Sequence, residues 1–114
     1  MITVKIVDII SSASAVSPRT GLKVFDFVSS QINKGNSLTV SFDGVEDLTS
    51  AFCNAFIGKL YMISDPTVLN SSLTFSDIDT ASIWYKKITN AILLGTNENA
   101  RTLHKENIES VIFS

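Results

Sequence analysis

The segment that decides the fold is residues 37–61, with the sequence SLTVSFDGVEDLTSAFCNAFIGKLY. It begins with alternating apolar and polar residues, and the apolar ones that share a face are Leu38, Val40 and Phe42. Asp43 and Gly44 form a turn signal that ends this strand. From Leu48 onward the apolar residues recur at helical spacing. The segment therefore predicts a strand, an acidic turn and then a helix.

Two hydroxyl residues, Thr49 and Ser50, stand where this helix is expected to begin. The first turn of a helix has unpaired backbone N–H groups and the positive end of the helix dipole, which together suit a phosphate or another anion. A hydroxyl side chain at the same place also serves as an ordinary helix cap. The pattern therefore predicts either a cap alone or a site for an anionic group.

The residues before this segment predict a first strand and a first helix. Alternation predicts a strand over residues 2–9, followed by a polar, flexible connection over residues 11–17. Ser17 and Pro18 are typical of a helix N-cap and of a first helical turn. Gly35 marks the expected end of this helix. The apolar residues expected on its buried face are Leu22, Phe25, Val28 and Ile32.

The residues after the segment predict a third strand and a third helix. Asp65 and Pro66 are expected to stop the second helix near Ile63, because the residue before a proline disfavours the helical conformation. The third strand is expected at residues 67–69 or 73–75, and we favour the latter as its end. Ser-x-x-Asp at residues 76–79 is a capping pattern. The apolar face of the helix that follows is Ala81, Trp84, Tyr85, Ile88, Ala91 and Ile92.

The sequence Gly-Thr-Asn at residues 95–97 predicts the end of this third helix. Residues 98–114 are expected to form either a short helix or an added strand. The order of elements is β-α-β-α-β-α, which predicts an α/β domain with a small, mostly parallel sheet. Because the strand at residues 38–42 alternates, we expect helices mainly on one face of the sheet, leaving an open face or edge for a partner.

Composition and charge exclude several classes of function. The chain has nine Lys and Arg against eleven Asp and Glu, a net charge of −2, so phosphate neutralisation on a nucleic acid is not expected. No apolar run is long enough for a bilayer and the N-terminus does not resemble a signal peptide, so we expect a cytoplasmic protein without a membrane role. The single cysteine, Cys53, allows no internal disulfide and is expected to be buried.

The sequence gives no catalytic or metal-binding constellation. The only histidine, His104, has no nucleophile or acidic pair near it in the sequence and is expected to be exposed to solvent. One histidine and one distant cysteine do not make a metal site, and the five glycines are too dispersed for a phosphate loop. We therefore expect a protein that is not an enzyme and that needs no cofactor or metal.

The region from Val40 to Tyr61 resembles a known family. The similarity lies in Phe-Asp-Gly-Val at residues 42–45, Leu-Thr-Ser-Ala-Phe at 48–52 and Ile-Gly-Lys-Leu at 57–60. These residues resemble the STAS-like domains of unknown function, bacterial proteins related to the anti-sigma factor antagonists. The resemblance extends more loosely over residues 17–94, which leaves 95–114 as a C-terminal extension of a single domain at residues 1–114. It implies a STAS-like fold.

The resemblance also implies a function and a site. Proteins of the wider STAS class are non-enzymatic regulatory modules that bind serine kinases of the histidine-kinase-like ATPase fold and are switched by phosphorylation. Ser50 occupies the position of the phosphorylated serine in the family's Asp-Ser-Ser-Gly run, and Thr49 occupies that of the aspartate. Here the run is Thr-Ser-Ala-Phe. The residues expected at a partner-binding or phosphoacceptor surface are Asp43, Gly44, Glu46, Asp47, Thr49, Ser50 and Asn54.

Two alternatives belong to other functional classes. One is a small-molecule or nucleotide-sensing domain that holds an anionic ligand at the start of the second helix. The other is a homodimeric structural module that pairs with a second copy through its sheet edge or its C-terminal segment.

Overall fold

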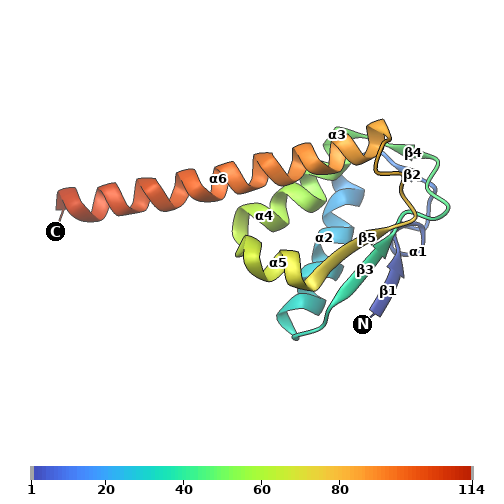
Figure 1. Ribbon diagram of the computed structural model, residues 1–114, viewed down its shortest axis with the longest axis horizontal. Helices are drawn as coiled ribbons and strands as arrows, with labels where there is room; N and C mark the ends of the chain where they lie inside the picture. The colour runs from blue at the N-terminus through green and yellow to red at the C-terminus, as the bar shows by residue number, and fades with distance from the viewer. Residues whose placement is uncertain (1, 114) are drawn as a thin grey trace.

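The computed structural model describes the backbone of residues 2–113 and the side chains of residues 2–99. Three short parallel strands, β1 (Ile2–Lys5), β3 (Leu38–Ser41) and β5 (Leu73–Ser76), form a sheet in the order β1-β3-β5. Most of the helices lie on one side of this sheet, and the longest of them, α6, runs far beyond it (Figure 1). The expected α/β class with a parallel sheet is confirmed.

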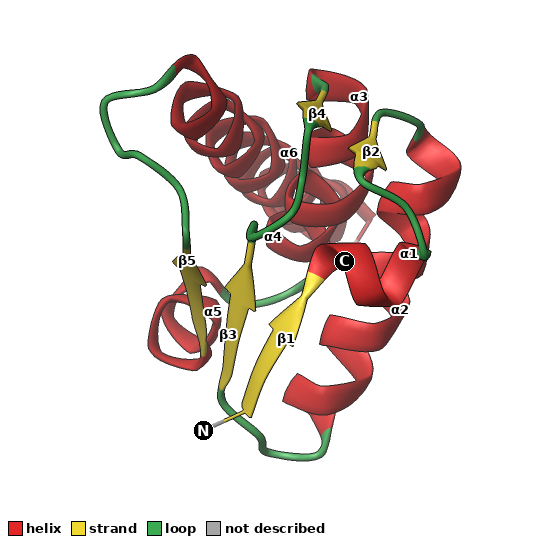
Figure 2. Ribbon diagram, turned by 90° about the vertical axis from the view of Figure 1, so that its right-hand side faces the viewer, coloured by secondary structure: helices red, strands yellow, loops and turns green. Residues whose placement is uncertain are grey.

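The register of the strands separates an apolar face from a polar one. One face carries Ile2, Leu38 and Leu73 in one row and Val4, Val40 and Phe75 in the next. The other face carries Thr3, Thr39 and Thr74, then Lys5, Ser41 and Ser76. Figure 2 looks onto the sheet, with α4 and α6 behind it, α2 beside β1 and α5 beside β5. The alternation predicted for residues 38–42 thus turns the apolar residues toward the helices. On the opposite face Thr3 and Thr74 are exposed to solvent, whereas Ser41 is buried.

The first strand is shorter than predicted. Residues 6–10 form a helix, α1 (Ile6–Ile10), and do not continue β1 to residue 9. Ile6 and Ile10 stand four positions apart and are both buried, so helical spacing brings both into the core. The connection that follows, predicted to be flexible, contains β2 (Ser14–Ala15), which pairs in parallel with β4 (Asp47–Leu48).

The helix α2 (Pro18–Asn33) begins as predicted, with Ser17 as its N-cap and Pro18 in its first turn. The Ser17 hydroxyl accepts a hydrogen bond from the Thr20 N–H at 3.2 Å. The predicted burial of Leu22 is wrong, because this side chain is 39% exposed. The predicted burial of Phe25 and Val28 is confirmed, and Gly21 and Val24 of α2 are buried as well.

The second helical region runs without a break over residues 50–63 in three parts: α3 (Ser50–Cys53), a π-helical turn η1 (Asn54–Gly58) and α4 (Lys59–Ile63). It begins two residues later than the apolar pattern predicts, because Leu48 is paired with Ala15 in the β2–β4 ladder. It ends at Ile63, as Asp65 and Pro66 predict. Pro66 then opens α5 (Pro66–Ser72), which excludes a strand at residues 67–69 and confirms β5.

The third helix, α6 (Ile83–Phe113), does not end at residues 95–97 as predicted. Gly95 lies against Gly58 of η1, where a methyl group on Gly95 would overlap the Gly58 carbonyl oxygen. The glycine therefore serves close contact between two helices and does not terminate one. Residues 98–113 continue α6, so neither the separate short helix nor the added strand forms.

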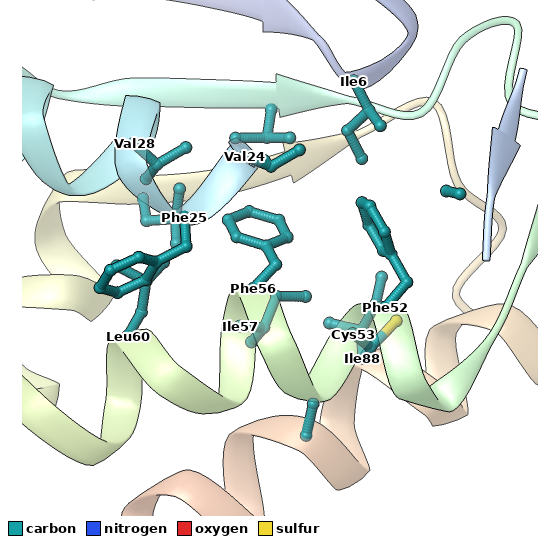
Figure 3. Packing of buried hydrophobic residues seen from close by; sticks show 14 of the residues in the cluster. Ile6, Val24, Phe25, Val28, Phe52, Cys53, Phe56, Ile57, Leu60 and Ile88 are labelled. Atoms are coloured by element: carbon teal, nitrogen blue, oxygen red, sulfur yellow. The ribbon is translucent and has the colours of Figure 1, made fainter. Parts of the chain in front are cut away.

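The core lies between the sheet and the helical region of residues 50–63. In Figure 3 the rings of Phe52 and Phe56 rise from that region toward the strands, with Val24 of α2 close by. The Phe52 and Phe56 rings meet edge to face with centroids 6.2 Å apart, a favourable arrangement for aromatic pairs. Ile88 of α6 belongs to the same buried cluster.

The contact between the two glycines predicts a large effect of a small substitution. Gly95→Ala should lower the free energy of unfolding by about 1–3 kcal/mol, because the added methyl has to push α6 away from η1. Asn97→Ala, at an exposed position of the same helix, should stay within about 0.5 kcal/mol of the wild type. Urea denaturation followed by circular dichroism measures both, and equal stabilities would contradict this packing.

Candidate functional site

Thr49 caps the helix that carries the predicted site. Its backbone is extended, and its hydroxyl oxygen accepts a hydrogen bond from the Phe52 N–H at 3.2 Å. The same hydroxyl donates to the Val16 carbonyl at 2.8 Å. Both the donor and an acceptor position of Thr49 are therefore in use within the fold.

Ser50 is placed differently from its neighbour. It is the first residue of α3 and its side chain is exposed to solvent. Its hydroxyl makes no hydrogen bond with any residue in the part of the chain that the structure describes. Of the two hydroxyls at the start of the helix, Ser50 is thus the one available for chemistry.

The loop before the helix is held by backbone pairing. The N–H groups of Glu46 and Asp47 both donate to the Ala13 carbonyl, at 2.9 and 3.3 Å, and the Thr49 N–H donates to the Ala15 carbonyl at 3.1 Å. The side chains of Glu46 and Asp47 are exposed. The loop therefore presents its two carboxylates to solvent from a fixed backbone.

A lysine approaches this loop from α6. The half-buried Lys87 donates through Nζ to the Leu48 carbonyl at 2.8 Å. Leu48 immediately precedes the cap residue Thr49, so the positive charge lies close to the start of the helix and adds to the positive end of the helix dipole. The sequence pattern of α6 gives no sign of this contact, because it joins residues far apart in the chain.

Asp43 belongs to a second polar cluster, at the carboxyl ends of the three strands. Gly44, the next residue, has a positive φ of 85° and faces the Val7 side chain of α1. Asp43 forms an ion pair with Lys5 at 3.0 Å, and its N–H donates to the Ser41 hydroxyl oxygen at 3.1 Å. The Ser41 hydroxyl donates to Asp77, to which the Ser76 hydroxyl also donates at 3.2 Å. No hydrogen bond or ion pair within the described residues joins this cluster to Ser50.

The ion pair raises the pKa of Lys5, first through its hydrogen bond to Asp43 and then through the charge of that carboxylate. Sequence reasoning missed Lys5, Ser41, Ser76 and Asp77. The first three share one row of the sheet register, so only the pairing of strands brings them together. Asp77 follows β5 with a positive φ of 58°, a conformation that Asp tolerates better than most residues.

Asn54 lies one turn after Ser50 and is exposed. It stands at the edge of a groove of about 340 Å³ between the helical region 50–63 and α6. The groove is lined by Asn54, Ala55, Gly58, Lys59, Met62, Leu94, Gly95 and Glu98. The structure thus divides the predicted site residues among four places: the strand-end cluster, the loop at residues 44–47, the helix start at residues 49–50 and the lining of this groove.

Cys53 is buried, as predicted, and its burial raises the pKa of its thiol to about 12. No cluster of three His, Cys, Asp or Glu residues suited to a metal ion occurs among the described residues. Within the same part of the chain, no helix combines the length and apolar character that crossing a bilayer requires. His104, expected to be exposed, lies outside the side chains that the structure describes.

The cap predicts different outcomes for two neighbouring substitutions. Thr49→Ala should lower the free energy of unfolding by about 1 kcal/mol, because the Phe52 N–H and the Val16 carbonyl lose their partner. Ser50→Ala should change it by less than about 0.5 kcal/mol, since the Ser50 hydroxyl has no partner to lose. Thermal and urea unfolding of the two variants distinguish the roles, and the reverse order of stabilities would contradict the assignment.

The buried thiol predicts a loss of stability at alkaline pH. Unfolded cysteine titrates near pH 8.5, whereas the pKa of Cys53 in the fold is about 12, so above about pH 9 the native state holds a proton that the unfolded state has lost. The free energy of unfolding should therefore fall as the pH rises from about 9. Cys53→Ala, although less stable overall, should show a shallower fall across the same urea titrations. If the free energy of unfolding falls equally steeply with pH in the wild type and in Cys53→Ala, the thiol of Cys53 does not titrate as stated.

Comparison with known proteins identifies the family. The sequence profile of the STAS-like domain of unknown function matches residues 20–82, more than half of the chain. The chain belongs to this family. Neither a curated protein nor a solved structure matches it.

Proposed function

We propose that this chain, as a member of the STAS-like family, is a non-enzymatic regulatory module that binds another protein through residues 44–54. The geometry of this surface supports the proposal. The β2–β4 pair and the Ala13 carbonyl fix the loop backbone, while Glu46, Asp47, Ser50 and Asn54 are exposed on it. A surface that is rigid before binding costs little conformational entropy when it is covered.

The observation that carries the proposal is the contrast between Ser50 and Thr49. Ser50 has an exposed hydroxyl without a partner in the described residues, whereas the hydroxyl of Thr49 is occupied by the cap. This contrast supports Ser50 as the residue that a kinase modifies. A phosphate on Ser50 would lie at the positive end of the helix dipole, an interaction worth about 0.3–1 kcal/mol at an exposed site.

The same phosphate would act on a partner through charge. It adds about −1.5 to −2 charges next to Glu46 and Asp47. A partner surface that accepts the unmodified loop would then face a much more negative one, and like charges at an interface are costly. Modification of Ser50 is therefore a switch for binding that leaves the fold intact.

The resemblance to the STAS class supports a serine kinase of the histidine-kinase-like ATPase fold as the partner. Such an enzyme transfers the γ-phosphoryl group of ATP to the Ser50 hydroxyl, which loses its proton, and ADP leaves. The module itself contributes the acceptor hydroxyl and the docking surface. Phosphoryl transfer of this kind needs no catalytic group from the chain that is modified.

Substitution of Ser50 tests the switch. Tagged wild-type chain should capture an ATPase from extract of its own cells, and Ser50→Asp should weaken that capture by at least about tenfold because of the added negative charge. Ser30→Asp, on the exposed side of α2, is the matched control and should bind as the wild type does.

Incubation of the captured ATPase with ATP and the chain, followed by mass spectrometry, completes the test. The expected result is a phosphate on Ser50 and none on Thr49. Capture of an ATPase that leaves Ser50 unmodified would contradict the phosphoswitch. Equal capture by wild type and Ser50→Asp would contradict the assignment of residues 44–54 as the binding surface.

A further inference from the structure

The outer edge of β1 has free backbone hydrogen-bonding groups. β1 pairs only with β3 in the described chain, and Figure 2 shows no strand beyond it. The Ile2 N–H donates to the Ser37 carbonyl of the inner side at 3.0 Å. Consecutive residues of a strand direct their N–H and C=O groups to opposite sides. The N–H and C=O groups of Thr3 and the N–H group of Lys5 therefore point outward, away from β3. These groups form a template for another strand.

A pocket of about 430 Å³ runs along the same edge. Its apolar walls come from three different elements, with Val4 on β1, Ile9 on α1 and Phe27 on α2. The Phe27 side chain is 36% exposed, and Ile2 at the start of the edge is 39% exposed. Apolar surface is thus exposed to water directly beside unpaired backbone groups, in a groove between a strand and a helix.

The charges at the pocket are unequal. Lys5 lines it, but its ammonium group is already paired with Asp43 at 3.0 Å. Asp8 also lines the pocket and forms no ion pair with any residue that the structure describes. Asp8 also acts on the Lys5 charge, since it is one of the carboxylates that raise the pKa of Lys5. Counted together, Lys5, its partner Asp43 and Asp8 leave one net negative charge at the pocket, which favours a positive group on its occupant.

We propose that the free edge of β1 binds an extended segment of another protein by strand addition. The Thr3 N–H and C=O and the Lys5 N–H make main-chain hydrogen bonds to that segment. An apolar side chain of the segment enters the pocket between Val4 and Phe27, and a neighbouring Lys or Arg meets Asp8. This site shares no residue with the surface at residues 44–54.

A second copy of this chain is a poorer occupant than a basic segment. Pairing of β1 with β1 of another copy would bring two pockets of the same negative sign together, since each carries its own Asp8 and the shared Lys5–Asp43 pair. Like charges facing each other across an interface oppose association.

The test uses a displayed library of linear dodecapeptides selected on the full-length chain. The peptides enriched should carry an apolar residue close to a Lys or Arg. Fluorescence anisotropy of a labelled selected peptide should show binding weakened by about tenfold or more in Phe27→Ser and in Asp8→Asn. Leu22→Ser, at a 39% exposed apolar residue of α2 outside the pocket, is the matched control and should bind within about twofold of the wild type.

Two further measurements address the main-chain bonds without altering the protein. Two versions of the peptide are N-methylated at every second amide, one at the even and one at the odd positions. One version should lose binding and the other should keep it, because only one edge of the added strand faces β1. Amide hydrogen exchange followed by NMR should slow at Thr3 and Lys5 when the peptide is bound.

Three results would overturn the proposal. One is a selection that enriches no peptide above background. The second is a selected peptide whose binding is unaffected by Phe27→Ser and by N-methylation at either the even or the odd positions. The third is a dimer in solution with the Thr3 and Lys5 amides already protected, which would assign the edge to a second copy. Ser50→Asp should leave peptide binding unchanged, so failure here is distinguishable from failure of the phosphoswitch.

Discussion

The close packing of residues 50–63 against three neighbours at once determines the rest of the architecture. Phe52 and Phe56 project from this region into the core beneath the sheet, and both are fully buried. Gly21 of α2 approaches its backbone so closely that a methyl group there would overlap the Phe52 carbonyl, and Gly95 of α6 does the same at Gly58. Because interiors tolerate little change in volume, the region has almost no freedom to shift.

Because residues 50–63 cannot shift, the positions of the exposed helix start and of the loop before it are fixed as well. The loop after β3 has to reach a helix start whose position is set by the core, and the β2–β4 pair and the Lys87 contact hold it on the way. Ser50 is thereby exposed on a rigid backbone, while the Thr49 hydroxyl accepts a hydrogen bond from the Phe52 N–H. A site of this kind suits recognition by another protein, for which a pre-formed surface avoids the cost of ordering a loop.

The features that sequence reasoning predicted correctly depend on local chemistry. Ser17 before Pro18, and Asp65 before Pro66, act on the backbone within one turn, so their effect is independent of the rest of the fold. The position of Thr49 at a helix start is of the same kind, as its cap bond spans three residues.

The errors arose where a distant contact decides the outcome. Gly95 looked like a helix terminator, yet its neighbour is Gly58, in another helix. Ile6 and Ile10 are compatible with both strand and helix spacing, and β1 ends at Lys5, where its pairing with β3 ends at Ser41. The strand-end cluster and the contact from Lys87 to Leu48 likewise depend on strand register and helix packing, which no local pattern contains.

The ion pair between Lys5 and Asp43 lies between the two proposed surfaces. Lys5 lines the β1 edge, while Asp43 begins the loop that leads to Ser50. Both side chains are about half exposed or more, and exposed ion pairs contribute little to stability because water and salt screen them. Coupling through this pair is therefore weak. A partner segment on β1 would remain bound whether or not Ser50 carries a phosphate, so the module could stay attached to one protein while its contact with another is switched.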